Sequence, residues 1–427
     1  MRKVFFAGCL FSCFFAVQGQ VRLEDCQRKA KANYPLVKQY KLLEQSRKYS
    51  VNQIFKAYIP QVALSGKMSW QSDVTAFPED FAKMLDQFNA RISFPGKDQY
   101  NVAVEVSQTV LDGGSSVIQK EMTNAQSDLD FQELEVNLYA LNEQINQLFF
   151  SVLLLDEQIR QNVLLNEELA RNYALVQSYM ENGVGQQSDL DAIQVEMLSS
   201  KQRDTEMKAS RKACIAMLAA FIGEPVSEEA VFEKPNAEFD LNEPLRRPEF
   251  AYFDMQIDLI GRQTKMLWAK AMPRLSLFAK GVYGNPGLNM FESGFTPYFV
   301  GGVQLLWNFG VLYSFGDEKN TIRTQKKQAE MRRDIFLFNM NQKLIQKNSE
   351  VEKMQQLLEN DMEIIRLRED IQKAADAKVE NGTMSINDLL HCINATSAAR
   401  QSKSYHEIQL LLAVWQLKTE RGLHINN

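Results

Sequence analysis

The chain of 427 residues has few of the residue types on which catalysis and metal binding depend. Its three histidines, His391, His406 and His424, show no metal-ligand spacing. The sequence also lacks a nucleophile elbow and a phosphate-binding loop. We therefore expect no enzyme activity, no cofactor and no metal site.

Cysteine and blocks of like charge are scarce as well. After residue 20 the cysteines are Cys26, Cys214 and Cys392, an odd number far apart, which does not fit a disulfide framework. Cys13 lies in a faint lipoprotein cleavage box, but the strongly apolar residues after it argue against acylation. The net charge is −5, and no basic block or arm indicates a nucleic-acid partner.

Long apolar runs are missing after the first twenty residues. At the N-terminus, Arg2 and Lys3 precede an apolar run over residues 4–17, and the small residue Gly19 follows. This pattern predicts a signal peptide over residues 1–19. The run is shorter than the roughly 20 residues of a membrane helix, which favours cleavage over a retained anchor. Because no later stretch can span a bilayer as a helix, an exported chain of this kind can enter a membrane only as strands.

One pattern occurs twice in the chain. Glu181-Asn182-Gly183 followed by Ser188-Asp189-Leu190 returns, 199 residues later, as Glu380-Asn381-Gly382 followed by Asn387-Asp388-Leu389. A duplication of such a long period predicts two copies of one structural unit.

The two copies are separated by a proline-rich stretch. Residues 223–248 contain four prolines and several acids, which is typical of a connecting segment. We therefore place the first repeat at 20–222 and the second repeat at 249–427.

In each copy a helical stretch, at about 36–57 and about 248–270, leads into two alternating runs, which predict a β-hairpin at about 60–110 and another at about 273–309. The runs are about ten residues long, the length that a tilted strand needs to cross a hydrocarbon layer. Strands of a half-buried soluble sheet alternate in the same way, and by themselves the runs favour a soluble sheet. The polar side of the first hairpin carries Ser65, Lys67, Asn101, Glu105, Ser107 and Thr109.

A glycine turn ends each hairpin, with Gly113 and Gly114 in the first copy and Gly310 in the second. The period then becomes helical over about 115–181 and about 314–380. Each of these runs covers roughly 66 residues, or on the order of 100 Å. No compact domain core can cover a helix of that length, so a coiled-coil-like assembly is expected.

Shorter return helices follow at about 188–222 and about 386–421. With them, each copy contains a leading helical stretch, two strands, one long helix and one return helix. Four strands of one chain cannot close into a barrel, and an open edge in lipid leaves backbone groups unsatisfied. Two chains would give eight strands with a filled interior, and three would give twelve strands around a wet lumen. Elimination therefore favours a homotrimer.

The order and spacing of these parts, together with the opening from Leu23 to Pro35, closely resemble the TolC-like outer-membrane efflux proteins. The resemblance covers nearly the whole mature chain. It implies a mixed α and β membrane protein, with four transmembrane β-strands per chain contributing to a trimeric 12-stranded barrel in outer-membrane lipid. A long periplasmic α-helical coiled-coil barrel and two internal structural repeats complete the implied fold.

The same resemblance implies the outer-membrane channel of a tripartite efflux system in a Gram-negative bacterium. Such a channel is a passive exit duct for small molecules across the periplasm and outer membrane. A periplasmic adaptor protein and an inner-membrane transporter of the RND or ABC type would open it. Two alternatives stay open: the outer-membrane duct of a type I protein secretion system and, from a different class, a non-pore coiled-coil scaffold of the cell envelope.

The turns between the helices are the candidate periplasmic tips and adaptor contacts. Gly183 and Gly382 can adopt the left-handed conformation that ends a helix. Gly185 and Thr383 complete the two turns.

Asp189 and Asp388 follow the tips at matching positions, and the family places constricting acids at the position of Asp388. In a three-fold symmetric assembly, each acid would form a ring of three carboxylates. These carboxylates would repel one another, bind cations and favour the passage of cationic solutes. The alternative is that an acid in the first turn of a helix only complements the helix dipole.

His391 stands where better-known members of the family have a second constricting acid, and Met384 where they often have an arginine. We hypothesise that a single acidic ring beside a histidine makes closure pH-sensitive. Conductance that stays unchanged between about pH 5 and pH 8 would contradict this hypothesis. The alternative is that His391 is a packed helix residue.

Overall fold

The computed structural model describes residues 20–88, 94–183, 185–236, 244–289, 291–292 and 294–423. The predicted signal peptide, residues 1–19, lies outside the described residues. The chain forms two compact units, and each draws segments from both predicted repeats. Unit 1 comprises Met1–Gln39, Leu134–Phe250 and Ile335–Asn427, and unit 2 comprises Tyr40–Glu133 and Ala251–Asp334.

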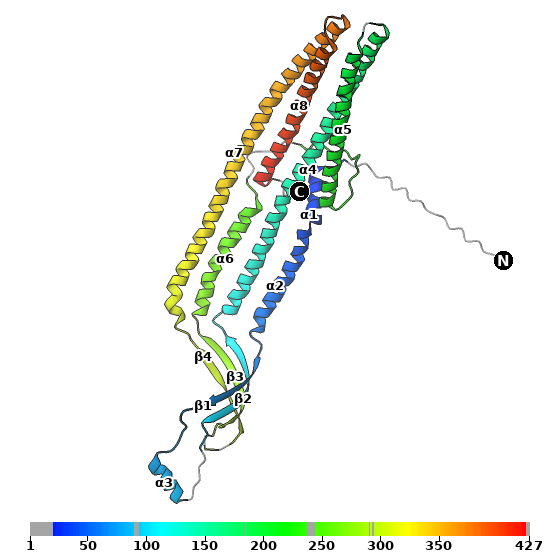
Figure 1. Ribbon diagram of the computed structural model, residues 1–427. Helices are drawn as coiled ribbons and strands as arrows, with labels where there is room; N and C mark the ends of the chain where they lie inside the picture. The colour runs from blue at the N-terminus through cyan, green and yellow to red at the C-terminus, as the bar shows by residue number, and fades with distance from the viewer. Residues whose placement is uncertain are drawn as a thin grey trace, which may run out of the picture. The chain divides into compact units, whose positions relative to one another are not determined.

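Unit 2 contains one four-stranded antiparallel sheet in the order β1-β2-β3-β4 (Figure 1). The strands are β1 (Gln61–Trp70), β2 (Asp98–Leu111), β3 (Arg274–Asn285) and β4 (Thr296–Leu306). All three pairings are antiparallel, so the two predicted hairpins join through β2 and β3. Within the described chain, β1 and β4 each have one edge without a partner strand.

The strand register gathers apolar side chains on one face of the sheet. Leu64 lies opposite Val104, Val104 opposite Gly281, and Gly281 opposite Phe299. This face is open, since Leu64 is 74% exposed and Phe299 is also 74% exposed. Because large exposed apolar patches are rare on monomeric soluble proteins, this face needs a cover.

The opposite face of the sheet carries the polar residues that the alternation predicts. Ala63 lies opposite Glu105, and Glu105 lies opposite Lys280. The Lys280 ammonium is 3.8 Å from the Glu105 carboxylate, an ion pair across neighbouring strands. The predicted residues on this face are Ser65, Lys67, Asn101, Glu105, Ser107 and Thr109.

A short helix that the sequence pattern did not predict lies between β1 and β2. It is α3 (Glu79–Gln87), and the ring of Phe81 contacts Phe77 just before it. Phe77 also stacks on Phe291, from the connection between β3 and β4, with ring centroids 5.5 Å apart. Aromatic contacts therefore tie the two hairpin connections together.

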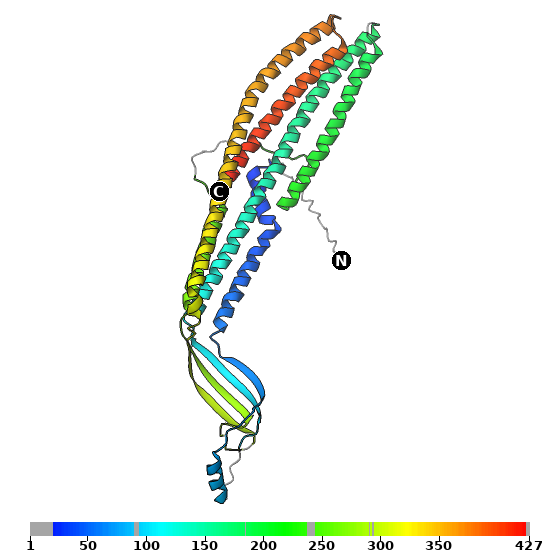
Figure 2. The same ribbon diagram turned by 60° about the vertical axis from the view of Figure 1, so that its left-hand side comes forward.

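Four helical segments of unit 2 lie side by side (Figures 1 and 2). They are most of α2 (Lys38–Lys56), most of α6 (Pro248–Lys270), and the starts of α4 (Ser115–Glu181) and α7 (Val311–Glu380). Arg47 donates to Asp128 at 2.9 Å and links α2 to α4. Arg333 donates to Asp254 at 3.3 Å and links α7 to α6.

Unit 1 contains α1 (Leu23–Asn33), α5 (Gln187–Ile222) and α8 (Ile386–Arg421) with the remaining parts of α4 and α7. A short 3₁₀ helix, Pro35–Val37, follows α1. The Asn33 side-chain amide donates to the Phe221 carbonyl at 3.1 Å and so caps the end of α5. Gly223, at φ 74°, ends that helix in the left-handed conformation.

One core cluster of unit 1, here called the α1 core, surrounds the middle of α4. Phe149 is fully buried, and its ring contacts Phe232 with centroids 5.2 Å apart. Phe232 belongs to the connecting segment and bridges to Val21. The other buried members are Leu23, Cys26, Ala30, Leu141, Ile145, Phe150, Val152, Leu153, Ile215, Leu218, Ile222, Ala230, Ile408 and Trp415.

A second cluster, here called the tip core, joins the last turns of α4 and α7 to the first turns of α5 and α8. Leu169, Ile193 and Ile393 are fully buried in it. Its other members are Leu165, Val176, Leu190, Ala375, Val379, Ile386, Leu389 and Leu390. Four helices of unit 1, α4, α5, α7 and α8, therefore pack together in one apolar cluster near the helix turns.

None of the described helices is long and apolar enough to cross a membrane. Of the cysteines, Cys26, Cys214 and Cys392 lie among the described residues, and all three are free thiols.

Buried polar groups also join the helices of unit 1. Burial opposes the ionisation of Glu157 on α4, but Arg160, Gln161 and Ser404 donate hydrogen bonds to its carboxylate. The net result is that the pKa of Glu157 falls to about 2. Since Ser404 lies on α8, at 3.1 Å from the carboxylate, the ionised form of Glu157 holds α8 against α4.

This arrangement predicts an acid-dependent stability. The folded-state pKa of Glu157 lies below its ordinary value of 4.5, so its contribution is complete above that pH and is lost as the pH falls toward about 2. Guanidinium unfolding followed by circular dichroism should show a free energy of unfolding that falls over this window, by on the order of 3 kcal/mol from this group.

Glu157→Gln should flatten the slope in that window, whereas the exposed Glu352→Gln on α7 should leave it unchanged. An unchanged slope in Glu157→Gln would show that the carboxylate does not carry the effect.

Candidate functional site

The two predicted tip turns lie at the same end of unit 1, above the tip core (Figures 1 and 2). The turn from α7 to α8 closes with two backbone hydrogen bonds. Gly382, at φ 67°, donates to the Val379 carbonyl at 2.9 Å, and Thr383 donates to the Lys378 carbonyl at 2.8 Å. This is the Schellman arrangement, and the Thr383 hydroxyl reinforces it by donating to Lys378 at 3.0 Å.

Ser385 caps the N-terminus of α8. The backbone N–H of Asp388 donates to Ser385 Oγ at 3.2 Å, and the Ser385 hydroxyl donates to Asp388 Oδ2 at 2.7 Å. The exposed Asp388 carboxylate is therefore oriented by the cap and lies in the first turn, where it also complements the helix dipole. The geometry therefore fits the alternative in which Asp388 complements the dipole of α8.

The turn from α4 to α5 has a different construction. Gly183, at φ 75°, donates to the Met180 carbonyl at 2.9 Å, and Gly185 donates to the Tyr179 carbonyl at 3.0 Å. A Cβ on Gly185 would lie 2.7 Å from the Met180 nitrogen, so only glycine fits there. Val184 of this turn lies outside the described residues.

The start of α5 has no side-chain cap. Its N-cap residue is Gln186, and the N–H of Asp189 donates to the Gln186 backbone carbonyl at 3.1 Å. Asp189 is half-buried, whereas Asp388 is exposed. The duplicated sequence therefore places the two acids in different surroundings.

His391 lies three residues after Asp388, about one turn further along α8, and it is exposed. It belongs to neither core cluster, whereas its neighbour Leu390 lies in the tip core. In the single chain, His391 is therefore exposed and does not pack in a core. The imidazole and the Asp388 carboxylate share the accessible side of α8.

A group of acidic side chains on α4 and α7, Glu168, Asp376 and Glu380, lies near the tips and was not predicted from the sequence. The Gln372 amide on α7 donates to the Glu168 carboxylate on α4. Burial raises the pKa of Glu168, and burial together with the nearby Glu380 raises the pKa of Asp376. The sequence around Glu168 does not predict its burial or its hydrogen bond, because its partner Gln372 lies on another helix.

The predicted strand-to-helix turns belong to unit 2. At the first, Asp112 accepts hydrogen bonds from the backbone N–H groups of Gly114 at 3.0 Å and Ser116 at 2.7 Å, and so caps α4. Gly113 and Gly114 have φ values of 70° and 84°. At the second turn, the N–H of Gly310 donates to Asn308 Oδ1 at 3.0 Å.

Among the described residues, no group of three or more histidine, cysteine, aspartate or glutamate side chains could hold a metal ion. The geometry at the tips instead supplies carboxylates on helix starts beside glycine turns.

The sequence of residues 27–224 matches the family model described as outer membrane efflux protein. A comparison with curated proteins finds no match. The resemblance predicted from the order of the elements is confirmed by this family match and by solved structures.

Several solved structures share the fold over most of their length. The outer-membrane channel OprN has 13% identity and a TM-score of 0.68, and the match covers 94% of this chain and 89% of that chain. The outer membrane protein VceC of Vibrio cholerae has 12% identity and a TM-score of 0.63, with 92% and 95% covered. The CmeC outer membrane channel of Campylobacter jejuni has 12% identity and a TM-score of 0.63, with 94% and 85% covered. At these identities the likeness establishes the fold.

The cap on α8 generates a local prediction. Ser385→Ala removes the oxygen that accepts from Asp388 N–H, and such caps contribute about 1 kcal/mol. Hydrogen exchange of the peptide spanning Ile386–Leu390 should therefore quicken by roughly fivefold. Ser188→Ala is the matched control, because the start of α5 has no side-chain cap; equal quickening in both variants would contradict the assignment.

The first strand-to-helix turn offers a matched pair of glycines. Both residues have positive φ, so alanine at either position should cost about 1–2 kcal/mol. A Cβ at Gly113 would also lie 2.6 Å from Met272 Cβ and 2.8 Å from the Ala269 oxygen, whereas Gly114 faces open space.

Gly113→Ala should therefore lower the free energy of unfolding by roughly 1–3 kcal/mol more than Gly114→Ala. Guanidinium unfolding of the two variants measures the difference. Equal losses would show that the close approach of Met272 does not constrain the turn.

Proposed function

We propose that this chain, which resembles the outer membrane efflux proteins in the sequence of residues 27–224 and in fold over nearly its whole length, is the outer-membrane channel of a tripartite efflux system. In this proposal it forms a passive, trimeric exit duct for small molecules. It extends from the outer membrane of a Gram-negative bacterium into the periplasm.

The observation that carries the proposal is the sheet of unit 2. Its apolar face is exposed on all four strands, with Val62 71% exposed, Met68 75% and Val303 63%. In water this face would be an aggregation surface, whereas in a bilayer it would face acyl chains. The opposite face carries the Glu105–Lys280 pair, which suits a wet lumen.

The unpartnered edges of β1 and β4 support assembly with other copies. Each edge leaves a row of backbone N–H and C=O groups that lipid cannot satisfy. Pairing β1 of one copy with β4 of the next satisfies both edges. Three copies give a 12-stranded barrel with room for water, which is the smallest closed assembly that could conduct.

The helix turns of unit 1 are the proposed periplasmic tips. There Gly183, Gly185, Gly382 and Thr383 would contact the periplasmic adaptor, which links the duct to an inner-membrane transporter. In a trimer the exposed Asp388 carboxylates would form a ring near the three-fold axis, beside a ring of His391. Such a ring would close the resting duct to anions and admit cations first.

Membrane fractionation followed by mass measurement tests the proposed function. A barrel should stay in the membrane through salt and carbonate washes, need detergent for release, and have the mass of three chains. Reconstitution in planar bilayers should then give discrete conductance steps. Release by carbonate would instead identify a peripheral scaffold without a pore.

The acidic ring generates a prediction on ion selectivity. Asp388→Asn removes one charge per copy at the aperture, so the preference of the reconstituted channel for cations over anions should fall by at least about twofold. Asp370→Asn is the control, since Asp370 is an exposed acid on α7 more than two turns before the helix end.

Reversal potentials in a salt gradient measure the preference. If the selectivity changes equally in both variants, or in neither, Asp388 does not line the aperture.

A further inference from the structure

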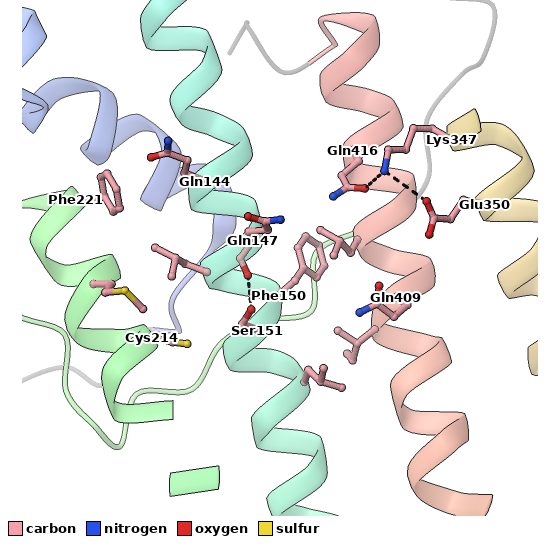
Figure 3. A pocket seen from close by; sticks show the side chains of 15 residues that line it. Gln144, Gln147, Phe150, Ser151, Cys214, Phe221, Lys347, Glu350, Gln409 and Gln416 are labelled. Atoms are coloured by element: carbon pink, nitrogen blue, oxygen red, sulfur yellow. Dashed lines mark hydrogen bonds and ion pairs between the residues drawn. The ribbon is translucent and has the colours of Figure 1, made fainter. Parts of the chain in front are cut away.

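A pocket of about 750 Å³ lies within unit 1, between α4, α5, α7 and α8 (Figure 3). Its volume is in the range of small-molecule sites. None of the residues at the tips contributes to it. Its lining combines an apolar floor with a polar rim.

The floor of the pocket is part of the α1 core. Phe150 is 2% exposed and Ile408 is 1% exposed, and both line the pocket. Leu154, Leu412 and Phe221 extend the apolar surface around them. An apolar floor set into a close-packed core gives a ligand a fixed surface on which to lie.

Unpaired amide groups form the rim. Within the described part of the chain, the side-chain amides of Gln144, Gln147 and Gln409 have no hydrogen-bond partner. Figure 3 shows Gln144 and Gln147 on α4 and Gln409 on α8. Each amide offers both donors and an acceptor, so the rim suits a molecule with hydroxyl and carbonyl groups.

The charges of the lining compensate each other. The Lys347 ammonium donates to Gln416 Oε1 at 2.6 Å and lies 3.5 Å from the Glu350 carboxylate. These are the charged side chains in the pocket lining. An anionic ligand would have to displace Glu350 from Lys347, and a cationic ligand would have to displace Lys347 from Glu350.

The walls of the pocket are held in place without a ligand. Arg211 pairs with Asp156 and fixes α5 against α4 one turn from Cys214, which lines the pocket. On the other side, Asn146 on α4 donates to Thr419 on α8 at 3.2 Å. A preformed site loses little ordering entropy when a ligand binds.

We propose that this pocket binds a neutral amphipathic molecule with a rigid apolar body and hydroxyl or carbonyl groups along its edge. The apolar body lies on Phe150 and Ile408, and the polar edge bonds to the amides of Gln147 and Gln409. The binding site rests on the pocket alone and does not require that the chain conducts.

Hydrocortisone is the probe, since it is neutral, rigid and edged with hydroxyl and carbonyl groups. Cholate is the matched probe, because it has a related steroid frame and carries a carboxylate. The full chain is reconstituted in lipid nanodiscs and alkylated with a maleimide. Peptide mass spectrometry then gives the rate at Cys214, with Cys392, which packs against the tip core, as the internal reference.

Saturating hydrocortisone should slow alkylation of Cys214 by roughly tenfold, because a bound ligand of this size covers the pocket wall. Cys392 should be unaffected, and cholate should protect Cys214 less at equal concentration.

Variants of one helix separate binding from general effects. Gln409→Leu removes one hydrogen-bonding group and should raise the concentration of hydrocortisone needed for protection by about three- to tenfold. Gln401→Leu, two turns earlier on α8, is the control and should behave as the unaltered chain. Ser151→Phe fills the pocket and should abolish protection, and Gln409→Leu keeps the test informative if that variant fails to fold.

Three results would overturn the proposal. They are alkylation of Cys214 that hydrocortisone does not slow, equal slowing at Cys214 and Cys392, and stronger protection by cholate. Because the readout is a thiol rate and not a current, a chain that binds hydrocortisone but does not conduct would refute the proposed duct alone.

Discussion

The burial of α4 is the constraint on which unit 1 depends. A helix of 67 residues cannot make a core of its own, so each length of its apolar surface needs a partner from elsewhere in the chain. The α1 core joins Phe149 of α4 to residues of α1, α5, α8 and the connecting segment in one cluster, and the tip core joins Leu169 of α4 to residues of α5, α7 and α8 in another. The two core clusters therefore bury successive lengths of α4, and the connecting segment is part of the α1 core.

Polar contacts then select one arrangement among those that apolar burial alone would allow. Asn162 on α4 and Ser200 on α5 are both buried; the Ser200 hydroxyl donates to the Asn162 side chain at 2.8 Å, and Asn162 donates to the Ser200 carbonyl at 3.0 Å. A shift of either helix along its axis would leave these groups unpaired in an apolar setting, which costs more than their pairing contributes. The Glu157–Ser404 contact acts in the same way between α4 and α8.

Periodicity predicted the helices and strands because it is a property of neighbouring residues. The alternation from Val62 to Trp70 and the unbroken run from Ser115 to Glu181 need no distant contact, and the structure has β1 and α4 there. It did not predict α3, since nine residues with a few aromatics carry little periodic signal. Nor could it find the pocket or the pairing of Gln372 with Glu168, because the partners of each lie on different helices.

The duplicated turns show how far a repeat in sequence departs from a repeat in structure. At the second turn the hydroxyls of Thr383 and Ser385 take part in three hydrogen bonds. Thr383 donates to the Lys378 carbonyl, Ser385 donates to the Asp388 carboxylate, and Ser385 accepts from the Asp388 backbone N–H. At the first turn Gly185 stands two residues after Gly183 and Gln186 provides no side-chain cap to α5.

Because a cap contributes about 1 kcal/mol, the start of α5 frays more readily than the start of α8. Local opening at this end of unit 1 is therefore expected to begin at the start of α5, while the start of α8, which carries the exposed Asp388, stays capped. The two copies thus begin their return helices differently, α5 without a side-chain cap and α8 with the Ser385 cap, although their sequences share the same Glu-Asn-Gly signature.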